Sequence, residues 1–342
     1  MRRAIPILLA VALAGCGGAG LERAAQRPAG TVATGLDVPW GIAFLPGGDA
    51  LVAQRDRGTI VRVSRRGRKR AVMRLPDVQP GGEGGLLGLA VSPRYRRDRF
   101  VYAYYTSRQG GNRIVRFRLG GRVRVLFAGI PSGPNHNGGR LAFGPDGKLY
   151  AGTGDAGDAA RAQRLDSEGG KILRLNPDGS RPADNPFPGS LVWSYGHRNV
   201  QGLAFDRAGR LWATEFGQNR LDEVNLIRRG RNYGWPAVEG RGDTRGGRLV
   251  NPKVTWSTEE ASPSGAAIRG PSLYVAALRG EALWRVPLRG GSVRRPRRLL
   301  HGRYGRLRTV VRAPDGSLWV ATSNRDGRGE PRRGDDRIVR LR

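Results

Sequence analysis

A histidine and an aspartate are the first residues of this chain whose types and spacing could do chemistry. His136 lies among glycines and asparagines in residues 134–141, where small side chains let a ligand approach the backbone closely. Asp155 follows in the short segment Gly-Asp-Ala-Gly at 154–157. A histidine that a carboxylate holds in one tautomer can accept a proton as a general base. The spacing alone fits two ordinary turn residues equally well, so both interpretations stay open at this point.

Composition excludes several other kinds of site. The 342 residues contain one cysteine and three histidines, which rules out a disulfide framework, an iron–sulfur cluster, a Cys-x-x-Cys-His haem attachment and a histidine-rich zinc site. A metal would therefore need oxygen ligands. The 60 basic and 28 acidic residues give a net charge of +32, but the arginines are spread along the chain and accompany no nucleic-acid-binding motif. We therefore expect no nucleic-acid partner.

Strands must position the candidate residues, because one pattern recurs six times along the chain. Each copy has an alternating apolar run, a turn rich in Pro, Asp or Gly, and a second apolar run. The first runs begin near Gly41, Leu87, Arg140, Gly202, Gly265 and Arg308, and the second near Ala50, Phe100, Leu149, Leu211, Leu273 and Leu318. This repeat predicts an all-β fold, a six-bladed β-propeller. A pair of β-sandwiches is the alternative architecture, but it does not explain the repeat.

In a propeller, the loops ahead of the inner strands meet at one central opening. We therefore expect the functional residues in residues 131–140 and 195–233, which are the two long irregular stretches. Tryptophans recur at blade positions and are expected to pack within or between blades; they are Trp40, Trp193, Trp212, Trp256, Trp284 and Trp319.

The first thirty residues resemble a bacterial lipoprotein signal. A basic start at residues 1–3 precedes a short apolar stretch and then Leu-Ala-Gly-Cys at 13–16. The resemblance implies a signal peptide at 1–15, cleavage before a lipid-anchored Cys16, a flexible tether at 16–30 and a propeller domain at 31–342. The alternative is an ordinary secretory signal with an incidental cysteine. Both predict a protein that works outside the cytoplasmic membrane, in the periplasm or at the cell surface.

Six short motifs, two of which contain His136 and Asp155, follow one another along the chain. They are Gly-Gly-Leu-Leu-Gly at 84–88, His-Asn-Gly-Gly-Arg-Leu at 136–141, Gly-Asp-Ala-Gly at 154–157, Gly-His-Arg-Asn-Val-Gln-Gly-Leu at 196–203, Asp-Glu-Val-Asn-Leu-Ile at 222–227 and Asn-Tyr-Gly-Trp-Pro at 232–236. With them, the chain from about residue 36 to residue 340 resembles the soluble sugar dehydrogenases that depend on pyrroloquinoline quinone (PQQ), the glucose/sorbosone dehydrogenase family.

The resemblance implies a calcium quinoprotein that oxidises the C1 hydroxyl of an aldose to the lactone. In the family pattern, His136 is the base that takes the hydroxyl proton while hydride passes to the C5 carbonyl of PQQ. Asp155 occupies the position of the aspartate that hydrogen-bonds this histidine. The electrons would pass on to a membrane quinone or to a soluble acceptor.

PQQ is a flat tricarboxylate, for which planar and permanently charged guanidinium groups are suitable partners. The resemblance assigns cofactor contacts to Arg198 and Asn199 and to Arg306 and Arg308. Arg279 stands where relatives can carry a lysine, which keeps the charge but changes the donor geometry.

Calcium prefers six to eight oxygen ligands, and a cation beside the quinone would polarise the carbonyl that is reduced. In the family, backbone carbonyls hold this ion, and they correspond to Gly217 and Gln218. A second, structural calcium corresponds to Asp222 or Glu223 together with Tyr233.

Glu83 occupies a position where glucose-oxidising relatives have a glutamine beside the substrate. A carboxylate changes the hydrogen bonds offered to sugar hydroxyls, so the substrate of this chain need not be glucose. The chain also lacks the long insertions of the largest relatives and looks more like the compact aldose dehydrogenases of broad specificity.

Two other functions compete with this one. A propeller that has lost its cofactor could bind glycans or a protein partner, but such a scaffold needs no base and no arginines at its opening. A calcium-dependent lactonase would need carboxylates and asparagines around the axial ion, and the motif residues fit the quinoprotein pattern better.

Overall fold

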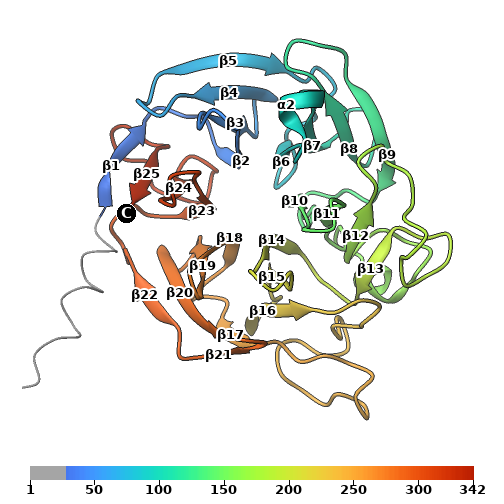
Figure 1. Ribbon diagram of the computed structural model, residues 1–342. Coiled ribbons are helices and arrows are strands. Elements are labelled where there is room, and N and C mark those ends of the chain that lie inside the picture. Colours follow the sequence, from blue (N-terminus) through green and yellow to red (C-terminus); the bar gives the residue numbers. More distant parts are fainter. Residues whose placement is uncertain (1–27) are drawn as a thin grey trace, which may run out of the picture.

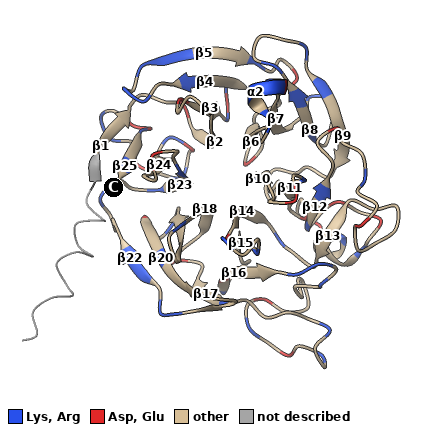
Figure 2. Ribbon diagram, viewed as in Figure 1, with Lys and Arg blue, Asp and Glu red and all other residues tan. Residues whose placement is uncertain are grey.

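The structure is a computed structural model that describes residues 28–342. Its strands form six antiparallel sheets that surround a central axis like the blades of a propeller (Figure 1). The predicted six-bladed β-propeller is therefore confirmed. Lysines and arginines are spread over all six blades (Figure 2), which agrees with their even distribution along the sequence.

Within each blade, the strands follow one another from the propeller axis outward. Blade 1 contains β2 (Pro39–Phe44), β3 (Ala50–Gln54), β4 (Thr59–Val63) and β5 (Lys69–Arg74); blade 2 contains β6 (Leu86–Val91), β7 (Val101–Thr106), β8 (Asn112–Phe117) and β9 (Arg124–Ile130). Blade 3 contains β10 (Leu141–Phe143), β11 (Leu149–Gly152), β12 (Lys171–Leu175) and β13 (Val192–Tyr195); blade 4 contains β14 (Val200–Phe205), β15 (Leu211–Glu215), β16 (Leu221–Ile227) and β17 (Val254–Ser257). Blade 5 contains β18 (Pro263–Arg269), β19 (Ser272–Ala277) and β20 (Ala282–Arg289), with both β21 (Ser292–Val293) and β22 (Arg297–Leu299) paired to β20. Blade 6 contains β23 (Leu307–Arg312), β24 (Leu318–Thr322), β25 (Ile338–Leu341) and β1 (Pro28–Ala33).

The turn between the first two strands is built in the same way in several blades. In blade 4, the Asp206 N–H donates to the Arg210 carbonyl and the Gly209 N–H donates back to Asp206. The same two backbone hydrogen bonds occur at Leu45, Gly144 and Ala313 in blades 1, 3 and 6. The repeat seen in the sequence is thus a repeat of turn geometry, and it gives equivalent positions that can be compared between blades.

The N-terminal strand of the described chain closes the ring. β1 pairs antiparallel with β25, with Thr31 opposite Val339 and Ala33 opposite Ile338. β1 begins at Pro28, inside the segment that the sequence assigns to the tether. The predicted signal peptide and lipid-anchored Cys16 lie outside the described residues.

Apolar side chains fill the spaces between neighbouring blades. One such cluster joins blades 2 and 3 through Tyr102, Tyr104 and Leu149. The tryptophans expected in the core are at most 6% exposed at positions 40, 212, 256, 284 and 319, and Trp193 is partly buried. Among the described residues, helices are limited to α2 (Tyr95–Asp98) and the 3-10 turn η1 (Ala159–Gln163). Within residues 28–342, no helix has the length and apolar character needed to cross a membrane.

Candidate active site

A cavity of about 370 Å³ lies where the loops ahead of the inner strands converge. Most of the residues predicted from the sequence line it, and they come from loops of at least five blades. Its walls are formed by Glu83, Asn135, His136, Arg198, Phe216, Gly217, Gln218, Asp222, Thr258, Ser262, Leu278, Arg279, Arg306 and Arg328. The propeller thus brings together residues that are far apart in the sequence.

The predicted His136–Asp155 pair is present in the structure. His136 Nδ1 lies 2.7 Å from Asp155 Oδ1, and the aspartate side chain is only 2% exposed. Asp155 also accepts hydrogen bonds from the Gly157 N–H at 2.9 Å and from the Trp235 indole N–H at 2.9 Å. Burial raises the pKa of Asp155, but these donors, His136 first, outweigh it and hold the pKa below its usual value. The ionised aspartate keeps the proton on Nδ1.

The other ring nitrogen of His136 is available for chemistry. No described residue forms a hydrogen bond with Nε2, and the side chain, which is 15% exposed, lines the cavity. Because Nδ1 donates to Asp155, Nε2 carries the lone pair. The ring is therefore oriented as a proton acceptor that faces the cavity.

The backbone of His136 is strained and held from both sides. Its φ of 54° lies in the left-handed region, which costs a non-glycine residue about 1–3 kcal/mol. The His136 N–H donates to Glu83 Oε2 at 2.9 Å, and its carbonyl accepts from the Ala156 N–H. Gly154 is required beside it, because a Cβ there would lie 1.9 Å from the His136 carbonyl oxygen. These contacts fix the direction of the imidazole.

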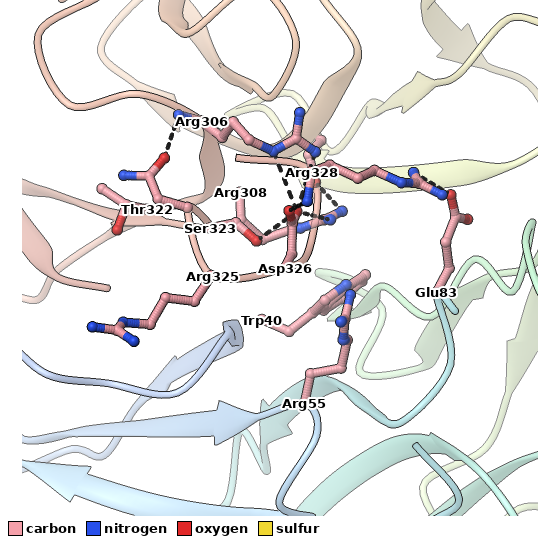
Figure 3. Close-up of polar contacts among 12 residues, drawn as sticks. Trp40, Arg55, Glu83, Arg306, Arg308, Thr322, Ser323, Arg325, Asp326 and Arg328 are labelled. Atoms are coloured by element: carbon pink, nitrogen blue, oxygen red, sulfur yellow. Dashed lines mark hydrogen bonds and ion pairs between the residues drawn. The ribbon is translucent and has the colours of Figure 1, made fainter. Parts of the chain in front are cut away.

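Glu83 connects this loop to blade 6. Its second oxygen, Oε1, accepts from Arg328 Nη1 at 3.0 Å across the cavity (Figure 3), and Asn199 Nδ2 lies 3.5 Å from Oε2. Burial raises the pKa of Glu83, but the His136 N–H and the charges of Arg328 and Arg308 lower it more. Glu83 is therefore an ionised carboxylate next to the histidine.

Arg198 and Asn199 enter the site from the start of blade 4. Arg198 Nη1 donates to the Gly217 carbonyl at 2.7 Å, and its guanidinium lies 5.5 Å from the centre of the Trp235 ring. The Asn199 side chain is fully buried, and its Oδ1 accepts from the Gly138 N–H in the His136 loop. Asn199 thus has a structural contact to the histidine loop besides its predicted role in cofactor binding.

Arg306 and Arg308 share one carboxylate that the sequence did not suggest. Asp326 Oδ2 lies 3.1 Å from Arg306 Nη2 and 3.5 Å from Arg308 Nη2 (Figure 3). Ser323 Oγ and the Arg328 N–H also donate to Asp326. Burial raises the pKa of Asp326, but the two arginines lower it more, so the carboxylate is ionised and fixes both guanidinium groups. Arg279 differs from them, because it forms an exposed ion pair with Glu259.

The residues predicted to bind calcium divide into two groups. Gly217, Gln218 and Asp222 line the cavity, whereas Glu223 and Tyr233 are buried and do not line it. Asp222 accepts from the Gly217 and Ser262 N–H groups, and burial raises its pKa to about 6. These positions are compatible with the predicted oxygen ligands.

Glu223 and Tyr233 are buried among protein groups. Burial and the charge of Glu215 raise the pKa of Glu223 to about 8. The Tyr233 hydroxyl donates to the Leu226 carbonyl. Among residues 28–342, no cluster of three or more His, Cys, Asp or Glu side chains has the arrangement of a metal site.

Four residues that shape the site were missed in the sequence. Trp235 donates to Asp155, Asp326 binds the two arginines, and Arg328 bridges to Glu83. Glu239 Oε1 accepts from four consecutive backbone N–H groups, of residues 218–221, and so holds the loop that carries Gly217. Trp235 lies in the Asn-Tyr-Gly-Trp-Pro motif, which was a usable signal, whereas nothing in the local sequence marks the other three.

The cavity suits a planar anion. The buried Nε atoms of Arg198 and Arg308 have no hydrogen-bond partner among the described residues. Burial lowers the pKa of Arg308 to about 10 although Asp326 lies beside it, so its charge is incompletely compensated. Several guanidinium groups around one cavity match a flat ligand that bears several carboxylates.

Comparisons with known proteins agree with this arrangement. The sequence profile named "Glucose / Sorbosone dehydrogenase" matches residues 36–337. The PQQ-bound aldose sugar dehydrogenase from Streptomyces coelicolor is 54% identical and superposes with a TM-score of 0.88 over 92% of this chain and 97% of that chain. Aldose sugar dehydrogenase YliI from Escherichia coli is 30% identical over 85% of this chain and 89% of its own length. Quinoprotein glucose dehydrogenase B from Acinetobacter calcoaceticus is 34% identical over 64% of this chain and 54% of its own length.

Fold, site and similarity together define a propeller oxidoreductase that acts on the CH–OH groups of sugars. The chain belongs to the glucose/sorbosone dehydrogenase family. The family and the enzyme class expected from the sequence motifs are confirmed.

Proposed function

We propose that this protein is a PQQ- and calcium-dependent aldose dehydrogenase that oxidises the C1 hydroxyl of its substrate to a lactone. The observation that carries the proposal is the orientation of His136, whose Nδ1 is bound to Asp155 while Nε2 faces a cavity lined by arginines. The PQQ-bound relative at 54% identity supports the choice of cofactor.

The arginines and Asn199 would hold the cofactor. Arg198, Arg306 and Arg308 offer planar donors to its carboxylates, and Arg279 adds positive charge at the edge of the cavity. The carbonyls of Gly217 and Gln218 and the carboxylate of Asp222 are the oxygen ligands that calcium prefers. Glu223 and Tyr233 remain the proposed ligands of a second, structural calcium. When bound, PQQ supplies the acceptor for the hydride of the sugar C1.

The residues of the chain would supply proton transfer and orientation. His136 Nε2 removes the proton from the C1 hydroxyl, so that the C1–O bond gains double-bond character as C1 loses its hydride. Asp155 stabilises the imidazolium that forms and keeps the ring in place. Glu83 accepts hydrogen bonds from sugar hydroxyls beside His136 and thereby selects among aldoses.

Titration of the purified apo-protein with PQQ, with and without calcium, tests this function when it is followed by dye reduction with a panel of aldoses. We expect calcium-dependent binding and aldose-dependent dye reduction. Binding without turnover on any aldose would contradict the proposed substrate class. Absence of PQQ binding would favour a propeller that has lost its cofactor and binds glycans or a protein.

We also propose that the protein is anchored by a lipid at Cys16 outside the cytoplasmic membrane and passes electrons to a quinone or a soluble acceptor. The lipoprotein-like sequence at 13–16 supports the anchor. Membrane fractionation of cells that express the wild type or Cys16→Ser tests it. Equal membrane association of the two chains would contradict a lipid anchor at this residue.

A further inference from the structure

A second cavity lies on the face of the propeller opposite the active site. Most active-site residues lie near the starts of the inner strands, whereas this cavity of about 250 Å³ is built from residues in and beside the turns at the other end of the strands of blades 1 and 6. It is lined by Phe44, Gly48, Arg65, Ala313, Pro314, Asp315, Trp319 and Arg340. None of these residues takes part in the proposed dehydrogenase site.

One polar atom in the wall of this cavity has no partner. Trp319 is 2% exposed, and its indole Nε1 is buried without an acceptor among the described residues. The ring itself is fixed, because it packs edge-to-face on Phe44 with the centroids 4.9 Å apart. A buried donor without an acceptor costs about 1–3 kcal/mol, so a native structure rarely keeps one without a reason.

Blades 2 to 5 have an aromatic side chain at the equivalent position, and in each of them its polar atom has a hydrogen-bond partner. Trp212 in blade 4 donates to Asp206 at 3.1 Å, and Tyr150 in blade 3 donates to Asp146 at 2.9 Å. Tyr102 in blade 2 donates to a backbone carbonyl, and Tyr274 in blade 5 accepts from Arg269. Trp284 also has an unpartnered indole nitrogen within the described chain, but it lies in the third strand of its blade and away from this cavity.

The missing acceptor can be traced to one residue. Ala313 occupies the turn position that Asp206 occupies in blade 4, with the same two backbone hydrogen bonds and the same six-residue distance to the tryptophan. Asp315 lies two residues after Ala313, at the position from which Asp146 accepts the Tyr150 hydroxyl in blade 3, so it could have served as the acceptor. Its carboxylate instead accepts from Ser317 and lies 3.7 Å from Arg340. Blade 6 therefore retains the donor and lacks the carboxylate.

The charges around the cavity favour an anion in that place. Within residues 28–342, Arg65 bonds only to the Gly47 carbonyl, and Arg340 has a single, long contact to a carboxylate that is more than half exposed. Phe44, Ala313, Pro314 and Trp319 supply an apolar wall. A small carboxylate with an apolar body would meet both guanidinium groups, and a small outward movement of the wall would bring one of its oxygens to the buried indole N–H.

We propose that this cavity is a binding site for a small carboxylate, whose oxygen takes the place that the Asp206 carboxylate holds in blade 4. The site is separate from the dehydrogenase site and does not depend on PQQ, calcium or sugar oxidation. The volume of about 250 Å³ limits the ligand to the size of a single ring or a short chain.

Calorimetric titration of the full chain with benzoate, phenylacetate and gluconate, in the absence of PQQ, tests the proposal. We expect benzoate or phenylacetate to bind, and both the neutral benzyl alcohol and gluconate, whose body is polar, to bind at least tenfold more weakly. Binding by neither benzoate nor phenylacetate, or equal binding of benzyl alcohol or gluconate, would overturn the proposal.

Ala313→Asp provides the matched control, because it restores within the chain the acceptor that blade 4 has. We expect this variant to lose carboxylate binding by at least tenfold and to unfold at the same or a higher temperature. Arg65→Gln, on an exposed turn, should weaken binding by severalfold without a change in stability. Unchanged affinity in both variants would place any observed binding elsewhere on the protein and overturn the proposed site.

Discussion

Two histidine–carboxylate pairs lie about the propeller axis, and their surroundings differ. His136 and Asp155 are 2.7 Å apart at the cavity, whereas His197 and Glu215 are 2.8 Å apart in the interior. His136 Nε2 has no partner among the described residues, but His197 Nε2 is bound to Ser194 Oγ at 2.9 Å. The His197 ring is also stacked on Tyr233 with the centroids 4.7 Å apart.

The difference shows what separates a base from a structural histidine. The distance from histidine Nδ1 to the carboxylate oxygen is nearly the same in both pairs. Neither the presence of a carboxylate partner nor this distance therefore identifies the reactive histidine. The second ring nitrogen does, because a base needs one free lone pair that faces the substrate. His197 has used both nitrogens to join β13 to β15, and it should contribute to stability alone.

Replacement of His136 should give the largest effect on turnover. His136→Asn keeps a side chain that tolerates the left-handed backbone, but it removes the base. We expect kcat to fall by at least a hundredfold, with the PQQ affinity and the urea midpoint close to those of the wild type. Steady-state dye reduction and PQQ titration measure these quantities, and wild-type turnover would rule out His136 as the base.

Replacement of His197 should have the opposite pattern. His197→Ala leaves Glu215 Oε2 buried without its hydrogen-bond partner, while Oε1 keeps the Arg198 N–H, and this loss should lower the free energy of unfolding by about 3 kcal/mol. Turnover of the fraction that remains folded should change by less than fivefold. Urea unfolding of the apo-protein measures the stability, and a loss of turnover without a loss of stability would erase the distinction between the two pairs.

Removing one neutral partner from each pair sharpens the comparison. Trp235→Phe deletes the indole donor to Asp155 but keeps an aromatic ring beside Arg198. We expect about a tenfold loss of kcat and a shift of the acid limb of the pH–rate profile to higher pH, because Asp155 becomes more basic and stabilises the protonated His136. Ser194→Ala deletes the partner of His197 Nε2 and should lower stability by about 1 kcal/mol with no change in that profile. An unshifted profile in Trp235→Phe would show that the indole does not act through the pair.

The smallest expected effect concerns acid stability. The pKa of Asp155 is lowered in the folded state, so its contribution to stability is complete above the unfolded value of about 4 and is lost as the pH falls through the folded value. Asp155→Asn should therefore show a shallower loss of stability between about pH 5 and pH 3 than the wild type. Urea midpoints across this range measure the slope, and a steeper loss in the variant would contradict the sign.

The sequence predicted those features that depend on local pattern. The inner strands start close to the positions read from the sequence, and His136 and Arg306 line the cavity as expected, whereas Arg308 is bound to Asp326 and is not among the lining residues. Contacts across the ring could not be read in this way. Glu83 and Arg328 are 245 positions apart, and Asp326 meets the two arginines only because a loop folds back within blade 6. Local periodicity determines strands and turns, whereas ring closure determines which loops meet.

The pairing of β1 with β25 also orders the events of biosynthesis. Among the described strands, β1 is the first to leave the ribosome and β25 the last, yet they are neighbours in one sheet. Five blades can form from consecutive segments, but the sixth must wait for the final residues of the chain. Until then, the edges of β1 and β24 are unpaired and open to other strands. A chain interrupted late in translation therefore lacks the β1–β25 pairing that closes the ring. Proteases and chaperones should recognise it as unfinished, although most of its blades are complete.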